Sequence, residues 1–165
     1  MHLEHSVVQH SVIVGFWSLV VPLGLTGLAA RQDIRSREIP DWVPLTLVGW
    51  AVVATAMHWN AISWPAFGVG LGIGLAVGIL LFASGGFGGG DAKLLIALGA
   101  ALGWKGILVT LVLMGLFGGV MSIVAKFRGK RDLAYGPAIA AGVTGYALLY
   151  GSAVLLLSHH AVVVR

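Results

Sequence analysis

The chain alternates between long apolar runs and short polar stretches. An α-helix rises about 1.5 Å per residue, so about 20 apolar residues cross the ~30 Å hydrocarbon core of a bilayer. The pattern therefore predicts an all-α, polytopic membrane bundle of about six transmembrane helices. The expected spans cover residues 12–30, 42–57, 66–83, 92–104, 106–125 and 135–157.

Two of these runs leave alternatives open. The run 92–104 gives only about 20 Å of helix, so five spans are the alternative to six. The first run has the length of a span, and a signal peptide is the competing interpretation. The residues before it contain Glu4 and no Lys or Arg, whereas a signal peptide begins with a basic segment. We therefore expect a span there.

Composition strengthens the membrane prediction. Of 165 residues, 58% are hydrophobic and only 10% are charged, against roughly 25% charged in a typical soluble domain. We expect one transmembrane domain over residues 1–165, with the lipid bilayer as its first partner. The net charge of +4 resides in short loops beside apolar runs, which argues against nucleic acid as a partner. The chain has no cysteine and its six histidines show no metal-ligand spacing, so we expect no cofactor and no metal.

The basic residues predict an orientation. Loops 31–41, 84–93 and 126–132 fall on one side of the predicted bundle and hold eight of the ten Lys and Arg residues. Cytoplasmic loops carry such an excess, so this side is expected to face the cytoplasm and both termini to lie outside. The eight residues are Arg31, Arg35, Arg37, Lys93, Lys126, Arg128, Lys130 and Arg131.

Glycines recur every four positions in two of the predicted spans. Gly70, Gly74 and Gly78 form one such row, and Gly115 and Gly119 form another. Small residues at this spacing let membrane helices approach closely. We expect both rows to pack against other helices and assign them no chemistry.

Two acidic residues stand closest to the apolar runs. Asp33 follows the first run and Asp91 opens the fourth, two membrane crossings later, so both are expected at the same membrane face. Acidic side chains near hydrocarbon are costly and usually functional. Two carboxylates in contact share a proton, and such a pair can activate water and polarise an amide carbonyl. The alternative is that each is a loop charge paired with a neighbouring Arg or Lys.

The segment before Asp91 is rich in glycine, with Gly at positions 85, 86 and 88–90. It lacks the G-x-x-x-x-G-K-[ST] pattern and follows no predicted strand, which argues against a phosphate-binding loop. Glycine permits close backbone approach, so an opening in which a substrate backbone lies against Asp91 fits better. Lys93 either tunes the local potential or anchors the helix end, and we favour the anchor.

Three motifs resemble those of the prepilin peptidases, a family of GxGD intramembrane aspartic peptidases. Gly88-Gly89-Gly90-Asp91, continued by Lys93, is similar to the GxGD motif. An earlier Asp followed seven residues later by Pro, with Asp33, Arg35 and Pro40, resembles the first family motif, and Tyr135-Gly136-Pro137 resembles a late one. The resemblance covers the chain from about residue 19 to 150.

This resemblance implies a function and a place in the cell. Asp33 and Asp91 are the implied catalytic dyad, cleaving the basic leader of type IV or Flp prepilins and pseudopilins at the cytoplasmic face of the bacterial inner membrane. Without cysteine, the chain is similar to the small Tad/Cpa type that lacks a methyltransferase domain. The implied substrate-binding or site-shaping residues are Gly88, Gly89, Gly90, Lys93, Arg35, Pro40, Tyr135, Gly136 and Pro137.

Other functions remain possible on the sequence. A presenilin-like intramembrane protease uses the same dyad, although the first and third motifs speak against it. A small proton-coupled transporter subunit uses membrane acids as proton relays, typically at mid-span. A structural assembly factor would tolerate replacement of the aspartates by asparagine. The pattern predicts neither the particular pilin nor an oligomeric state.

Overall fold

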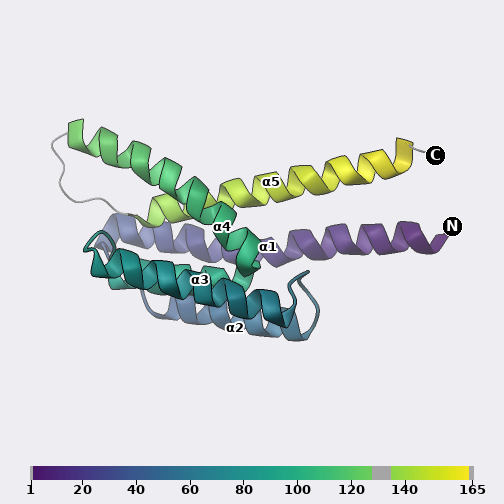
Figure 1. Ribbon diagram of the computed structural model, residues 1–165, viewed down its shortest axis with the longest axis horizontal. Coiled ribbons are helices and arrows are strands. Elements are labelled where there is room, and N and C mark those ends of the chain that lie inside the picture. The colour runs from purple at the N-terminus through teal and green to yellow at the C-terminus, as the bar shows by residue number, and fades with distance from the viewer. Residues whose placement is uncertain (1, 128–134, 164–165) are drawn as a thin grey trace.

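The computed structural model describes residues 2–127 and 135–163, with side-chain surroundings for 18–127 and 135–154 and for Leu156. These residues form helices without a strand, as the apolar pattern predicts (Figure 1). The helices are α1 (His2–Ser36), α2 (Trp42–Ala56), α3 (Trp64–Ala83), α4 (Gly89–Phe127) and α5 (Gly136–Val163).

α4 consists of two helical segments that meet at a kink, so the segments predicted at 92–104 and 106–125 are both present. The kink lies at Gly103, which has φ 66° and ψ 179°, two residues before the break expected at Lys105. This backbone conformation is essentially restricted to glycine. The second half of α4 then returns toward the end of the bundle at which the helix began (Figure 1). The described residues thus form five labelled helical elements, the fourth of which changes direction at a single glycine without a loop.

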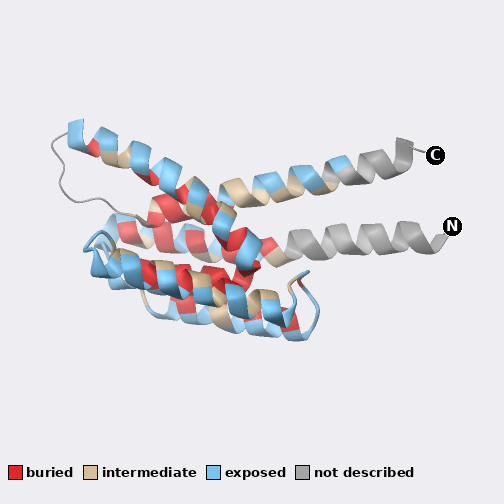
Figure 2. Cartoon of the chain, in the orientation of Figure 1, coloured by how far each residue is buried: buried red, intermediate tan, exposed pale blue. Residues whose placement is uncertain are grey.

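The first half of α4 forms the centre of the bundle. Leu94, Leu95 and Leu98 are completely buried there, and the most extensive contact of α4 is with α3 (Figure 2). Lipid tails are as apolar as leucine, so close packing rather than water exclusion holds such helices together.

The predicted glycine row on α3 makes this packing possible. A Cβ atom on Gly74 would lie 2.5 Å from the carbonyl oxygen of Leu95, and one on Gly78 would lie 2.9 Å from that of Ala92. Gly70 makes the same kind of approach to the backbone of α4. The expectation of tight packing is confirmed for this row.

The same expectation is wrong, within this chain, for Gly115 and Gly119. A Cβ atom on either glycine would meet no atom within 4 Å. Both lie on the second half of α4, where Leu116, Phe117 and Val120 are also exposed. The returning half of α4 packs on α5 with other positions, since a Cβ atom on Gly118 would meet Ala138 and one on Gly142 would meet Met114.

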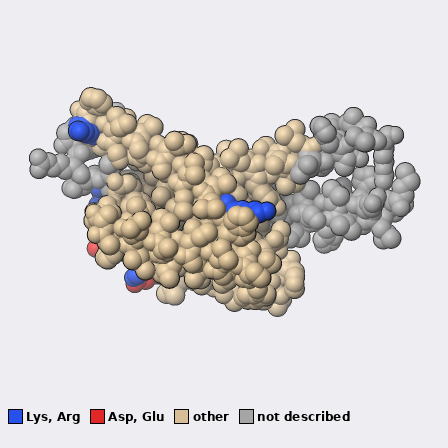
Figure 3. All heavy atoms as spheres, in the orientation of Figure 1, with Lys and Arg blue, Asp and Glu red and all other residues tan. Residues whose placement is uncertain are grey.

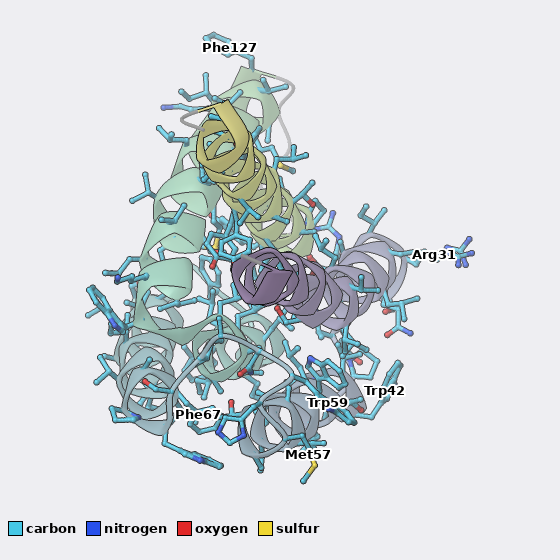
Figure 4. All side chains as sticks on the ribbon, turned by 90° about the vertical axis from the view of Figure 1, so that its right-hand side faces the viewer. Arg31, Trp42, Met57, Trp59, Phe67 and Phe127 are labelled. Atoms are coloured by element: carbon cyan, nitrogen blue, oxygen red, sulfur yellow. The ribbon has the colours of Figure 1, made fainter. Side chains whose placement is uncertain are left out.

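The described surface suits a bilayer. Among the residues whose side-chain surroundings are described, three helices are long and apolar enough to cross a membrane, namely α3, α4 and residues 136–154 of α5, and α2 is a shorter apolar helix. The face in Figure 3 is almost free of charged groups. Trp42, Met57, Trp59 and Phe127 project from the bundle (Figure 4), and each is about half exposed or more.

The polar loops that carry the motifs lie together. The ends of α1, α3 and the second half of α4 share one end of the bundle, and the loops after Ser36 and Ala83 start there (Figure 1). The first turn of α1 and the last turn of α5 lie at the opposite end. The basic residues expected at 128–131 fall outside the described residues.

Candidate active site

Asp33 lies on the last turns of α1, where the polar stretch continues the helix beyond the apolar run. Its side chain is buried, with 6% exposed. The backbone N–H of Gly136 donates a hydrogen bond of 2.7 Å to Asp33 Oδ2. A carboxylate oxygen that accepts a backbone N–H is fixed in direction, so the start of α5 orients this acid.

Gly136 must be a glycine for this contact. A Cβ atom at position 136 would lie 2.9 Å from both Cβ and Oδ2 of Asp33, and 3.2 Å from Cα of Ala30. The third motif therefore packs directly on the first aspartate. Pro137 follows in the first turn of α5, a position where its missing N–H has no helical partner to lose.

Asp91 lies in the first turn of α4 and is 7% exposed. The backbone N–H of Gly88 donates to Asp91 Oδ2 at 3.3 Å, and the Gly88 carbonyl accepts from the N–H of Ala92. Gly88 is thus the N-cap of α4, and Asp91 reaches back to it as the acid of a capping box does. The other oxygen, Oδ1, is buried without a partner among the described residues. An acceptor left free in this way is available to a substrate or a water molecule.

The two carboxylates belong to one site. The charge of Asp33 acts on the carboxyl group of Asp91, although the two residues come from different helices. A Cβ atom on Gly90 would lie 2.9 Å from Cβ of Ile39, so the start of α4 packs on the loop that follows α1. Gly90 and Gly136 are points of close packing that bring the three motifs to the end of the bundle where Asp33 and Asp91 lie.

An aromatic pair links the glycine loop to the third motif. The rings of Phe87 and Tyr135 stack with centroids 4.5 Å apart and planes 23° apart. The sequence motifs indicate Tyr135 as a site residue, but they do not indicate Phe87 or Ile39. Phe87 is the one large side chain in the glycine run, and this interruption of the run could have indicated a role for Phe87 in the site. Ile39 carried no signal beyond its place in the first motif.

Lys93 joins the second motif to the first. Its Nζ lies 2.6 Å from Oδ1 of Asp41, and the two side chains are 54% and 67% exposed. The ammonium group of Lys93 therefore anchors the start of α4 to the loop before α2, as the anchoring interpretation predicts. Asp41 is an exposed partner of this lysine, whereas Asp33 and Asp91 are buried.

The remaining predicted residues have less direct contacts. Arg35 is exposed on the last turn of α1. Pro40 is half-buried, and its carbonyl oxygen accepts from the N–H of Val43. A Cβ atom on Gly89 would make only an ordinary contact, 3.8 Å from the ring of Phe82. Within the described residues no three His, Asp or Glu side chains gather in a way that could hold a metal ion.

The arrangement has the parts that hydrolysis of an amide requires. Two carboxylates face one site, each has one oxygen held by a backbone amide, and one oxygen of Asp91 is free. Two like charges that act on each other disfavour the doubly ionised state, so such a pair can share one proton. One member is then a base and the other an acid.

The chain is similar to known proteins along most of its length. The profile of the type IV leader peptidase family matches residues 11–123. A prepilin leader peptidase/N-methyltransferase of Xanthomonas campestris is 30% identical over 151 residues, which cover 82% of this chain and 50% of the relative. Those of Burkholderia pseudomallei and Bacillus subtilis are 32% and 30% identical, over 76% and 90% of this chain and 43% and 61% of the relatives.

The chain spans about half the length of the curated relatives that it matches. No solved structure matches it at a significant level. The family profile covers more than half of the chain and includes both Asp33 and Asp91. On its buried carboxylate pair and on this match, the chain belongs to the type IV leader peptidase family.

Proposed function

We propose that this chain is a membrane aspartic endopeptidase that removes the basic leader of type IV or Flp prepilins and pseudopilins. One observation carries the proposal. Asp33 and Asp91 are buried at the same end of the bundle, interact electrostatically, and are each held by a backbone amide. The names of the relatives, which include leader peptidase activity, agree with it.

The chemistry follows from a shared proton. The ionised member of the pair takes a proton from a water molecule, whose oxygen attacks the carbonyl carbon of the scissile amide. The protonated member donates a hydrogen bond to the carbonyl oxygen as that oxygen gains charge. Collapse of the tetrahedral intermediate then breaks the C–N bond, and the leaving nitrogen takes up a proton.

The site is proposed to face the cytoplasm from a bacterial inner membrane. Among the described cations, Arg31, Arg35, Arg37, Lys93 and Lys126 belong to the end of the bundle that carries the dyad, and Lys105 belongs to the other. An excess of basic residues is typical of the cytoplasmic side. A leader that is still in the cytoplasm would meet the two aspartates there.

The position of the acids favours this function over proton transport. Asp33 is three residues from the last residue of α1, and Asp91 is in the first turn of α4. A proton relay across the membrane needs ionisable groups along its path. A pair confined to one end instead suits a substrate whose cleavage site lies beside the membrane surface.

The test is the cleavage of a co-expressed prepilin, followed as a mobility shift on a gel. We expect the wild-type chain to cut, and Asp33→Asn and Asp91→Asn to insert normally and leave the prepilin uncut. Asn keeps the shape of Asp but cannot act as a base. Asp41→Asn is the matched control, because Asp41 is an exposed acid at the same end.

Cleavage by both Asn variants would refute the dyad. A prepilin that matures in cells without this chain, while the chain itself never cuts, would refute the peptidase assignment. The transporter and assembly-factor alternatives would then be the next to test.

A further inference from the structure

A cavity of about 350 Å³ opens at the end of the bundle opposite the two aspartates. It lies between α1, the start of α3, the turn in α4 and α5, so it is separate from the proposed active site. Figure 4 views the bundle from this end, and Trp59 and Phe67 are labelled in the lower half of the view. The lining residues that matter here are Leu19, Ile62, Gly103, Lys105, Tyr146 and Tyr150.

The walls of this cavity are fixed by specific contacts. Asn60 is buried, donates to Oγ1 of Thr55 at 3.1 Å and accepts from the N–H of Ile62 at 3.2 Å. These bonds hold the loop before α3 in place. On the other wall, a Cβ atom on Gly106 would lie 3.1 Å from Oη of Tyr146, so this tyrosine rests directly on α4. Such preorganised walls are typical of binding pockets.

Within the described residues, no acid neutralises the positive charge of Lys105 at this cavity. Lys105 Nζ lies 5.3 Å from the ring centroid of Trp104, and no carboxylate pairs with it within residues 18–127 and 135–154. The hydroxyl groups of Tyr146 and Tyr150 also have no hydrogen-bond partner in that part of the chain. The described acids all belong to the other end, namely Asp33, Glu38, Asp41 and Asp91.

We propose that this cavity binds the phosphate group of an anionic phospholipid. An ammonium group beside free hydroxyl donors suits a phosphate oxygen. Basic pockets between transmembrane helices bind acidic headgroups on the cytoplasmic side, and we apply the same pairing of charges to a cavity at the opposite end of the bundle. The contact with Trp104 agrees with an anion, because Lys105 would repel a cationic ligand from the same aromatic surface.

The surroundings favour a lipid over a free phosphate ion. Leu19, Ile62 and Leu102 supply apolar lining beside the polar groups. Trp104 lines the cavity and is 41% exposed, and Trp64, which follows the lining residue Ser63, is 53% exposed, as expected of indole rings at the level of lipid headgroups. An acyl chain can follow this apolar wall while the phosphate meets Lys105.

Native mass spectrometry of the full chain in detergent tests the proposal, with phosphatidylglycerol and phosphatidylcholine as the two probes. We expect the wild-type chain to retain phosphatidylglycerol in preference to phosphatidylcholine. Lys105→Gln should weaken the binding of phosphatidylglycerol about fivefold, the effect of one cation at a headgroup. Tyr150→Phe, which removes only a hydroxyl, should also weaken it, whereas Lys105→Arg should retain it.

Lys126→Gln is the matched control, because Lys126 is an exposed lysine in the last turn of α4, at the end of the bundle away from the cavity. An equal loss in Lys105→Gln and Lys126→Gln would indicate attraction to general surface charge and would overturn the proposal. Excess inorganic phosphate distinguishes the two sources of the ligand. If it displaced the lipid, the site would be one for a free anion. The readout does not depend on peptidase activity, so it stands apart from the proposed function.

Discussion

At the scale of single residues, the Lys93–Asp41 ion pair gives Asp41 a role different from that of the proposed catalytic pair, Asp33 and Asp91. Its side chains are more than half exposed, and such pairs contribute only about 0.2–1 kcal/mol. We therefore expect Asp41→Asn and Lys93→Gln each to lower prepilin cleavage by less than about fivefold. Cleavage rates of both variants, and of the double variant, provide the measurement. The double variant should be no worse than the more affected single variant, because one interaction is lost in all three.

A hundredfold loss in Asp41→Asn alone would contradict this assignment. Asp41 would then belong with Asp33 and Asp91 in the catalytic group. The distinction matters because Asp41 lies in the same motif as Asp33, and sequence spacing alone does not separate them.

Gly136 gives a sharper prediction at the same scale. In Gly136→Ala the new Cβ would lie 2.9 Å from the Asp33 carboxylate and displace it. A misplacement of about 1 Å can cost about a hundredfold in rate, so we expect a loss of that size in prepilin cleavage. Gly151→Ala on the same helix is the control, since its Cβ would meet nothing within 4 Å. Equal activity of the two variants would show that Gly136 does not position Asp33.

Single residues also show which features of the site could be predicted from the sequence. Asp33 and Asp91 were identifiable because acids beside apolar runs are rare and costly. Gly136 and Lys93 were recognisable by motif, but their contacts with Asp33 and Asp41 join residues far apart in the chain. Such contacts depend on how helices pack, which spacing along one segment does not specify. The stack of Phe87 on Tyr135 was missed for the same reason.

At the scale of elements, the contact between α3 and α4 depends on glycine. A Cβ atom in Gly74→Ala would lie 2.5 Å from a backbone oxygen of α4, and the backbone has no flexible side chain to move aside. We expect a loss of about 1–3 kcal/mol in the free energy of unfolding, the usual cost of overpacking. Unfolding in mixed micelles, followed by circular dichroism, measures it. Gly72→Ala is the control on the same helix, with open space around its Cβ.

If Gly74→Ala and Gly72→Ala proved equally stable, close packing would not explain the glycine row. The comparison with Gly115 and Gly119 shows why the pattern alone was insufficient. Both rows have the same spacing, yet among the described residues only the row on α3 has a partner. A small-residue row predicts that a helix can be approached closely, and the fold decides whether another helix does so.

The turn in α4 is a second limit on prediction at this scale. Hydropathy places a break near Lys105, because a charged residue interrupts an apolar run. The helix turns instead at Gly103, where only the backbone conformation matters. The two predicted segments exist as two halves of one helical element. Hydropathy predicts both segments and a junction within two residues of the observed kink, but it does not identify the glycine whose backbone makes the turn.

At the scale of the whole molecule, the arrangement of helix ends predicts opposite accessibility for two loops. The loop after α3 lies at the end with the aspartates, and the loop before α3 lies at the other end. If the aspartates face the cytoplasm, Ser84→Cys should be protected from a membrane-impermeant maleimide in intact spheroplasts and Ala61→Cys should be labelled. Both positions are exposed, and the chain has no native cysteine, so labelling reports only the introduced thiol. Both variants should label after permeabilisation.

Labelling of Ser84→Cys alone would reverse the proposed orientation, whereas labelling of both in intact spheroplasts would mean that the two loops do not lie on opposite sides of the membrane.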